Sequence, residues 1–399
     1  MGHGHSHRAD HSAPEFEVGR TPRVALLSAL AAVGVATLVG LLLLWPDGTQ
    51  ADELQGSLAF AGEGVTFPEA VVQDVEPECS DPAQPDPAAE CGRIHATVDE
   101  GPDRGTDVVV DVPPQVSGSG LGEGDRIELV QHPELSVDEG RFTYFGTDRS
   151  APLWTLLIAF VVVVLAVARF RGLMALLGLG FASVVVFVFA LPALLTGGPG
   201  IAVALVAATA IMYVVLYTTH GFSIRTSTAL AGTLAGLGIT AAVGWWAVRS
   251  THLSGISGEE GGVLTTYAPD VSFQGLLTAA VIIAGLGILN DVTITQSSAV
   301  WELRAASPTM SRTEIFTSGM RIGRDHIAST IYTIVFAYAG TALALMLVLQ
   351  LYDRPILDLL GTEEISQEIV RSLVSSIGLV LAVPLTTAIA ALTVPGGHD

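Results

Sequence analysis

Eight apolar runs of 17 to 26 residues constrain this chain of 399 residues more than any other feature. About 20 apolar residues are needed to cross a bilayer as a helix. Only 14% of the residues are charged, against roughly 25% in soluble domains. We therefore predict a membrane α-helical bundle of about eight transmembrane helices, with the lipid bilayer as its first partner. The runs cover residues 24–45, 152–168, 173–195, 201–219, 226–248, 273–298, 327–351 and 372–394.

The long interval between the first two runs predicts a separate inserted domain. A cleaved signal peptide is the alternative for the first run, but its apolar part exceeds the usual length of about 7–15 residues. We therefore expect an uncleaved anchor. The predicted division is a His-rich tail (1–23), an anchor helix (24–45), an acidic domain (46–150) and a seven-helix domain (151–399).

The acidic domain holds 23 of the 39 acidic residues but only five of the 18 basic ones. Such an excess of negative charge excludes nucleic acid as a partner. Short β-branched or aromatic runs at 94–98, 108–110, 126–130 and 141–145 alternate with turn residues. We predict a small β-rich domain, either an OB-like barrel or a loose β-sandwich.

Arginine placement predicts the orientation, because short cytoplasmic loops are enriched in basic residues. With the N-terminus inside, ten arginines fall in cytoplasmic segments and three in short outer loops. Both termini are then cytoplasmic and residues 46–150 are extracytoplasmic. The sequence has no lysine and abundant Ala, Val and Gly, a composition that suggests a bacterium, so we expect a bacterial plasma membrane. An oxidising compartment in turn predicts a disulfide between Cys79 and Cys91.

Four histidines near the start form a candidate metal site, because clustered imidazoles bind transition metals. They lie in a tail with nothing nearby to order them, so we expect weak, adventitious binding and no other cofactor. They are His3, His5, His7 and His11.

The run at 273–298 contains the most informative polar residues. Asp291 is followed at helical spacing by Thr295, Ser298 and Glu302. On a helix these four residues fall within a stripe about 60° wide. A carboxylate in the hydrocarbon region is costly and needs a partner or water. We expect this stripe to face the bundle interior or a hydrated path.

The start of the next run has a similar arrangement. His326, Thr330 and Thr333 share one helix face, with Arg324 and Asp325 beside them. Together with Asp291 these are the ingredients of a proton or cation relay. The alternative is helix capping with a structural ion pair between Asp291 and Arg324.

The connector between these two runs predicts a break and a restart. Pro308 ends the first helix, and Ser311 with Glu314 three residues later indicates a capping box. A short amphipathic helix over 312–320 is expected to bury Ile315, Phe316 and Met320 against the membrane or the bundle.

Glycines indicate close helix packing. Gly232 and Gly236 form a small-xxx-small motif, and Gly285 and Gly287 are expected to loosen the helix just before Asp291. No GxSxG, HExxH or Walker A pattern occurs in the sequence, which favours a protein that is not an enzyme.

As a set, the motifs over residues 152–394 resemble the YibE/F-like bacterial membrane proteins. The resemblance implies the same helical layout and emphasises Asp291, Arg324 and Asp325, but it brings no activity with it. The matching pieces are Phe170-Arg171-Gly172, Leu191-Pro192, Gly197, Pro199, His220-Gly221-Phe222, Gly232-x-x-x-Gly236, Ser254-Gly255, Gly285-x-Gly287-x-x-x-Asp291, Glu302, Pro308, Ser318-Gly319-Met320, Gly323-Arg324-Asp325 and Ala337-Tyr338-x-Gly340.

Two functions remain open from the sequence. The first is a transporter or permease-like protein with a proton- or cation-coupled polar path around Asp291, whose outer domain binds a solute. The second is a non-transporting envelope assembly or signalling component whose outer domain binds a protein. Either protein is compatible with an oligomer.

Overall fold

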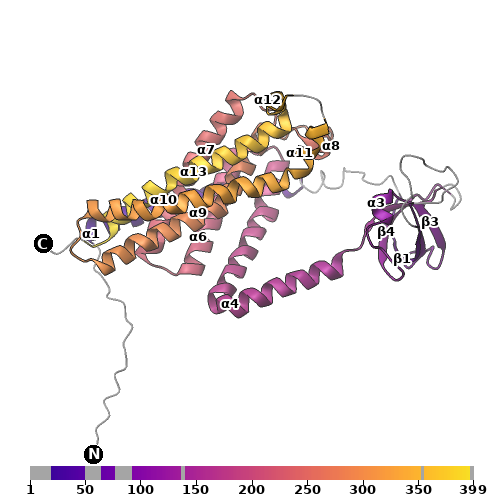
Figure 1. The fold of residues 1–399 in the computed structure, drawn as a ribbon, viewed down its shortest axis with the longest axis horizontal. Coiled ribbons are helices and arrows are strands. Elements are labelled where there is room, and N and C mark those ends of the chain that lie inside the picture. The colour runs from indigo at the N-terminus through magenta and orange to yellow at the C-terminus, as the bar shows by residue number, and fades with distance from the viewer. Residues whose placement is uncertain (1–18, 50–63, 77–91, 136–139, 352–354, 396–399) are drawn as a thin grey trace, which may run out of the picture. The chain divides into compact units, whose positions relative to one another are not determined.

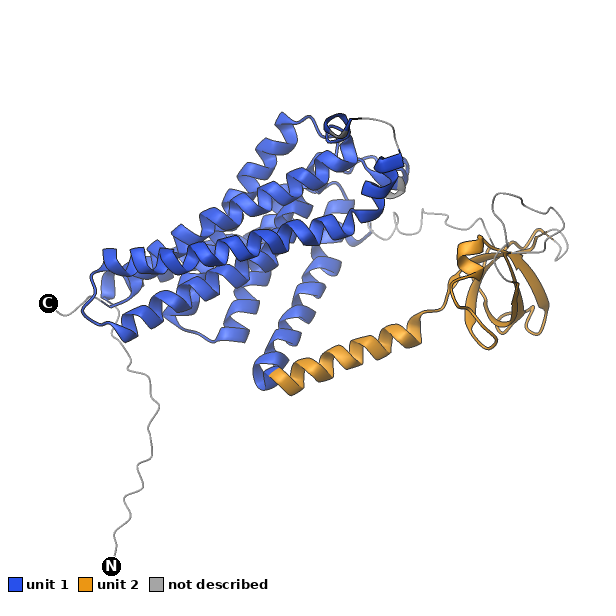
Figure 2. Cartoon of the chain, viewed as in Figure 1, with its two compact units in different colours: residues 1–54, 168–399 blue, residues 55–167 orange. Residues whose placement is uncertain are grey.

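The structure is a computed structural model that describes residues 19–49, 64–76, 92–135, 140–351 and 355–395. The chain divides into two compact units (Figure 2), residues 1–54 with 168–399 and residues 55–167. Figure 1 labels their elements, and each unit is described by itself.

The first unit is helical. Its elements, with helix α4 shared between the two units, are α1 (Arg20–Leu43), α4 (Ser150–Val184), the π-helix η2 (Val185–Ala190), α5 (Leu191–Leu195), α6 (Gly200–His220), α7 (Ile224–Ser250), α8 (Gly258–Tyr267), α9 (Phe273–Ala306), α10 (Arg312–Thr341), α11 (Leu343–Leu351), α12 (Ile356–Leu359) and α13 (Glu363–Thr393).

Within the described residues, six helices are long and apolar enough to cross a membrane, or up to seven if α10 and α11 form one span bent by 60°. The predicted count of eight is not confirmed. The difference arises at residues 150–195, which the sequence divides into two spans and the structure joins into one element of 46 residues. Its backbone leaves helical geometry at Arg169, where φ is 52°.

Helices α7, α9 and α13 pack against one another at the centre, and α6 and α10 flank α9 (Figure 1). Glycines allow the close approach. A methyl group added at Gly232 would collide with Thr386 of α13, and one at Gly236 would collide with Leu289. By contrast Gly287 has no neighbour within 4 Å, and α9 continues through it as a regular helix.

Helix α10 begins as the sequence predicts and ends elsewhere. The capping box is confirmed: Ser311 Oγ accepts the Glu314 N–H at 3.2 Å, and Glu314 Oε2 accepts the Ser311 N–H at 2.8 Å. The prediction of a short helix over 312–320 followed by a separate span is wrong, because α10 runs unbroken from Arg312 to Thr341. Buried Gly323 lets this continuous helix pack closely on Val383 and Gln296.

The second unit contains one five-stranded antiparallel sheet in the order β3-β2-β1-β4-β5. The four predicted strands are confirmed, whereas β1 was not anticipated because charged residues interrupt its alternation. The sheet is curled (Figure 1), and a single sheet does not fit the predicted alternative of a sandwich. The strands are β1 (Glu69–Glu76), β2 (Arg93–Val98), β3 (Asp107–Asp111), β4 (Arg126–Gln131) and β5 (Phe142–Thr147), with the short helix α3 (Pro114–Ser117) after β3.

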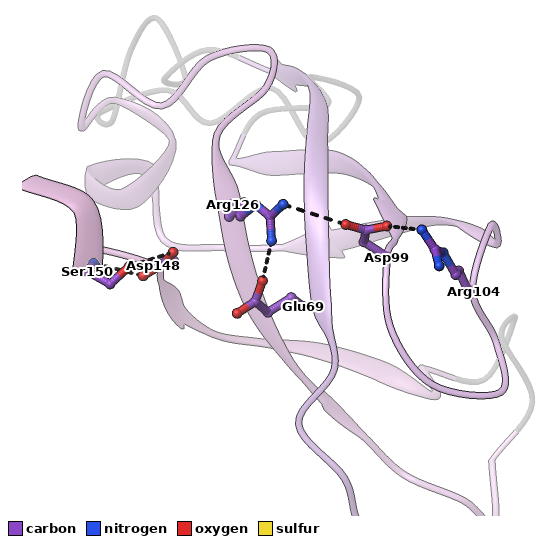
Figure 3. A network of polar contacts seen from close by, with 6 residues as sticks. All are labelled: Glu69, Asp99, Arg104, Arg126, Asp148 and Ser150. Carbon is purple, nitrogen blue, oxygen red and sulfur yellow. Dashed lines mark hydrogen bonds and ion pairs between the residues drawn. The ribbon is translucent and has the colours of Figure 1, made fainter.

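A charged network joins the ends of β1, β2 and β4 (Figure 3). Arg126 donates to Glu69 at 2.7 Å and lies 3.7 Å from Asp99, which also accepts from Arg104 at 3.2 Å. The hydrogen bond to Glu69, with the negative charges of Glu69 and Asp99, raises the pKa of the Arg126 guanidinium. The network therefore holds neighbouring strands together at the surface of the sheet.

Asp148 begins α4. Its carboxylate accepts the Ser150 backbone N–H at 2.8 Å and the Ser150 hydroxyl at 3.1 Å. These two bonds, the backbone one first, lower the pKa of Asp148. The ionised carboxylate is therefore the form that starts the helix.

Candidate functional site

Helix α9 carries small or polar residues along one exposed or half-buried face. They fall within a stripe about 80° wide, here called the exposed face of α9. Side-chain exposure is 73% for Asp291 and 76% for Glu302. The expectation that this stripe faces the bundle interior is therefore wrong for the single chain, and a hydrated path stays a prediction. The face consists of Ala284, Gly287, Asp291, Thr295, Ser298 and Glu302.

Asp291 pairs with His326 of α10. His326 Nε2 lies 4.0 Å from Asp291 Oδ2, which is within ion-pair range but too long for a hydrogen bond. The His326 side chain is 33% exposed, and its Nε2 atom is buried. A carboxylate and a titratable imidazole thus meet between two packed helices.

The alternative ion pair between Asp291 and Arg324 is not formed among the described residues. The helical period explains why. Arg324 precedes His326 by two residues and therefore lies about 160° around α10 from it. Arg324 and Asp325 are both exposed on α10, away from the contact with α9.

The two threonines of α10 extend the polar surface beyond His326. Thr330 Oγ1 donates to the His326 carbonyl at 2.8 Å, and Thr333 Oγ1 donates to the Ser329 carbonyl at 3.4 Å. Thr330 is half-buried and Thr333 is exposed. Because each hydroxyl donates its proton to a carbonyl of α10, its oxygen remains available to accept a hydrogen bond.

Glu302, near the end of α9, lies 4.0 Å from Arg225 of α7. An exposed ion pair of this kind contributes about 0–1 kcal/mol. Half-buried Ser298 lies one turn before it. Glu302 is therefore an exposed member of the face, fixed only weakly.

The opposite face of α9 is also polar, but it is packed. Gln296 is 3% exposed and Thr293 is fully buried. Gln296 Nε2 donates to the Gly319 carbonyl of α10 at 2.8 Å and to Thr387 Oγ1 of α13 at 2.7 Å. Thr293 shares a hydrogen bond of 2.6 Å with Thr233 of α7. These residues, with Ser297 and Arg304, are here called the buried face of α9.

Ser297 and Arg304 complete the buried face. Ser297 donates to the Arg225 carbonyl at 2.8 Å. Arg304, 1% exposed, donates through Nη1 to the carbonyls of Pro308 at 2.9 Å and Met310 at 2.7 Å. Arg304 therefore closes the turn between α9 and α10.

Sequence reasoning missed the buried face. The available signal was Gln296, a side chain with two hydrogen-bonding ends inside an apolar run. Its partners lie 23 and 91 residues further along the chain, so no local pattern could name them.

The candidate disulfide and the candidate metal site lie outside the described residues. They comprise Cys79, Cys91 and the histidines at 3, 5, 7 and 11. In the described part of the chain, no group of three or more His, Cys, Asp or Glu side chains could hold a metal ion.

Comparison with known proteins decides the family. The model of the YibE/F-like proteins matches residues 156–396, which is more than half of the chain. The chain belongs to the YibE/F-like family. No curated protein and no solved structure matches it.

The YibE/F-like region includes α6, α7, α9, α10 and α13, and it begins within α4. Both faces of α9 thus belong to the family region, whereas the five-stranded sheet precedes it. The predicted resemblance is confirmed.

Proposed function

We propose that the chain is a transporter or permease-like membrane protein that passes protons or cations along the exposed face of α9. The observation that carries this proposal is the approach of Asp291 to His326, 4.0 Å apart on two helices. Burying an ionisable residue in a membrane span costs free energy, so such a residue usually marks an ion or proton pathway.

The chemistry of the pair suits proton transfer. Histidine has an ordinary pKa near neutrality and can accept or release a proton under physiological conditions. Asp291 places a carboxylate, a second group that can carry a proton, 4.0 Å from the ring. Thr295 and Thr333 expose hydroxyl oxygens on either side of the pair, which can bind water or a partly dehydrated cation.

Flux through proteoliposomes tests the proposal. Wild-type protein is compared with Asp291→Asn in vesicles that contain a pH-sensitive or cation-sensitive dye. We expect Asp291→Asn to lower the flux at least about tenfold, equivalent to about 1.4 kcal/mol. Glu364→Gln is the matched control, because it neutralises an exposed carboxylate at the start of α13. Equal flux in wild type and Asp291→Asn would overturn the proposal.

A second candidate is a non-transporting envelope component, favoured by the outer face of the sheet. There Arg93 pairs with Asp111 at 3.0 Å, and exposed Val109 lies between Asp111 and Asp107 on β3. A mixed polar and apolar surface of this kind can bind a protein. The strand order, with β1 shared between β2 and β4, supports an OB-like barrel. Absence of flux in the wild type, with an envelope protein captured through residues 51–148, would favour this candidate.

We also propose that eight helices cross a bacterial plasma membrane. The 46 residues from Ser150 to Leu195 would extend about 69 Å as one helix, roughly twice the hydrocarbon thickness. The non-helical backbone at Arg169 supports two spans joined on the cytoplasmic side, near Arg171. Both termini are then cytoplasmic, and the β domain is extracytoplasmic. A cysteine at position 169 labelled from outside intact cells would contradict this topology.

A further inference from the structure

The exposed faces of two neighbouring spans differ in chemistry. On α13 the exposed residues from position 373 onward are all aliphatic, as expected for a surface in contact with lipid. On α9 the exposed face is small or polar throughout. The α13 residues are Leu373, Ile377, Leu381, Leu385 and Leu392.

A hydrogen bond sets the relative depth of these two helices. Gln296 of α9 donates to Thr387 of α13, so these two residues lie at one level. Both helices run in the same direction, and Asp291 lies about 7.5 Å before Gln296 along the axis. Leu381 of α13 therefore lies near the level of Asp291, and exposed Leu392 lies beyond the level of Gln296. Asp291 is thus at a depth where α13 presents leucine to lipid.

A carboxylate cannot face acyl chains at this depth without a large cost. His326 covers Asp291 only partly, since the Asp291 side chain remains 73% exposed. The cost falls if a polar or charged surface lies against the exposed face of α9.

Among the described residues, His326 is the one group of opposite charge that lies against Asp291. Residues 151–159 of α4, all apolar except Thr155, carry no charge that could oppose Asp291. Helix α1 packs on α6 and α7 instead. The neighbouring helix α10 does carry an exposed cation, Arg321, which has no ion-pair partner among the described residues.

We propose that a second copy of this chain covers the exposed face of α9, with Asp291 of each copy paired to Arg321 of the other. A two-fold axis along the membrane normal keeps both copies in one orientation and makes each contact occur twice. Arg321 lies about 7.5 Å along α10 from His326, which is level with Asp291, and about 140° around that helix. It therefore lies on the outer surface of α10, where its long side chain can reach a neighbouring copy but not Asp291 of its own chain. Gly287 and Ala284 let the helices approach closely.

This inference goes beyond the proposed function, because the exposed carboxylate needs a partner whether or not a solute moves. A second copy in this position would also line the other side of the polar path. The two proposals can be refuted independently, because transport is tested by flux and pairing of two copies is tested by their association.

Charge exchange tests the pairing. Asp291→Arg and Arg321→Asp are each expected to lower co-purification of two differently tagged copies at least about tenfold, because like charges then meet twice. Co-expression of one copy carrying each substitution restores opposite charges at both contacts, so the mixed pair should co-purify as the wild type does. Unchanged association in both single variants, or no recovery in the mixed pair when each variant is monodisperse in detergent, would overturn the proposal.

Cross-linking in membranes gives an independent measurement. Thr295→Cys should form a disulfide-linked dimer under mild oxidation, whereas Leu385→Cys, exposed near the same depth on α13, should not. The wild type, which retains Cys79 and Cys91, reports the background. If Thr295→Cys instead reacts with a water-soluble maleimide and gives no dimer, the face lines an aqueous groove in a monomer and the inference is wrong.

Discussion

The two faces of α9 are both polar, yet they meet different surroundings. On the buried face Gln296 and Thr293 hydrogen-bond to α7, α10 and α13. On the exposed face Asp291 has one partner at 4.0 Å and most of its surface free. Polar residues in one membrane span can therefore meet two kinds of surroundings. Satisfied groups fix the packing of helices, whereas an exposed charge such as Asp291 remains accessible to water, to an ion or to another chain.

The glycine contacts of the buried core should give the largest effect on stability. Gly232→Leu would force a side chain into Thr386, and overpacking of this kind costs about 1–3 kcal/mol. Thermal unfolding in detergent measures it. Gly238→Leu is the control on the same helix, because Gly238 is exposed with no neighbour within 4 Å. Equal losses from both variants would show that helix packing at Gly232 is not the cause.

The hydrogen bonds of the buried face come next. Gln296→Leu removes two interhelical bonds and should lower the free energy of unfolding by about 0.5–2 kcal/mol. Thr295→Val, on the exposed face one residue earlier, should change it much less. If Thr295→Val is the more damaging change, the assignment of the two faces is reversed.

A substitution on the exposed face should change flux without lowering the free energy of unfolding. Asp291→Asn should not lower the free energy of unfolding of a single copy, because it removes a charge that is costly in a membrane span and has one partner at 4.0 Å. Flux should still fall at least about tenfold. Unfolding is measured on the monomeric species, so that loss of the second copy does not enter. A large destabilisation of the monomer would indicate a structural role for Asp291.

The smallest effect is expected outside the membrane, where water competes for every polar contact. The lowered pKa of Asp148 means that its contribution is complete above the ordinary value of 3.8 and is lost as the pH falls through the lower folded value. Hydrogen exchange of the Ser150 amide should therefore show protection at neutral pH that declines only in strong acid. Asp148→Asn keeps an acceptor but cannot titrate, so its protection should not depend on the charge of this group. A decline in wild type that begins near pH 6 would contradict the assignment.

Much of the fold could be predicted from local patterns. Apolar length predicts the spans, and the spacing of Ser311 and Glu314 predicts the start of α10. Short β-branched or aromatic runs between turn residues predict four of the five strands. The prediction failed where local signals conflict: β1 contains charged residues because its outer side meets water, and α10 continues through Gly323 because packing on Val383 outweighs the low helix propensity of glycine.

From the sequence alone we could infer that this YibE/F-like chain is a membrane protein, that α9 carries a polar stripe, and that Asp291 belongs to it. Which side of α9 is packed emerged from the three-dimensional contacts. A helix with polar residues on both faces gives no local signal for that choice, because it depends on partners such as Thr233 and Thr387, which lie 60 and 91 residues away in the sequence. Those contacts take Gln296 into the core and leave Asp291 at the surface.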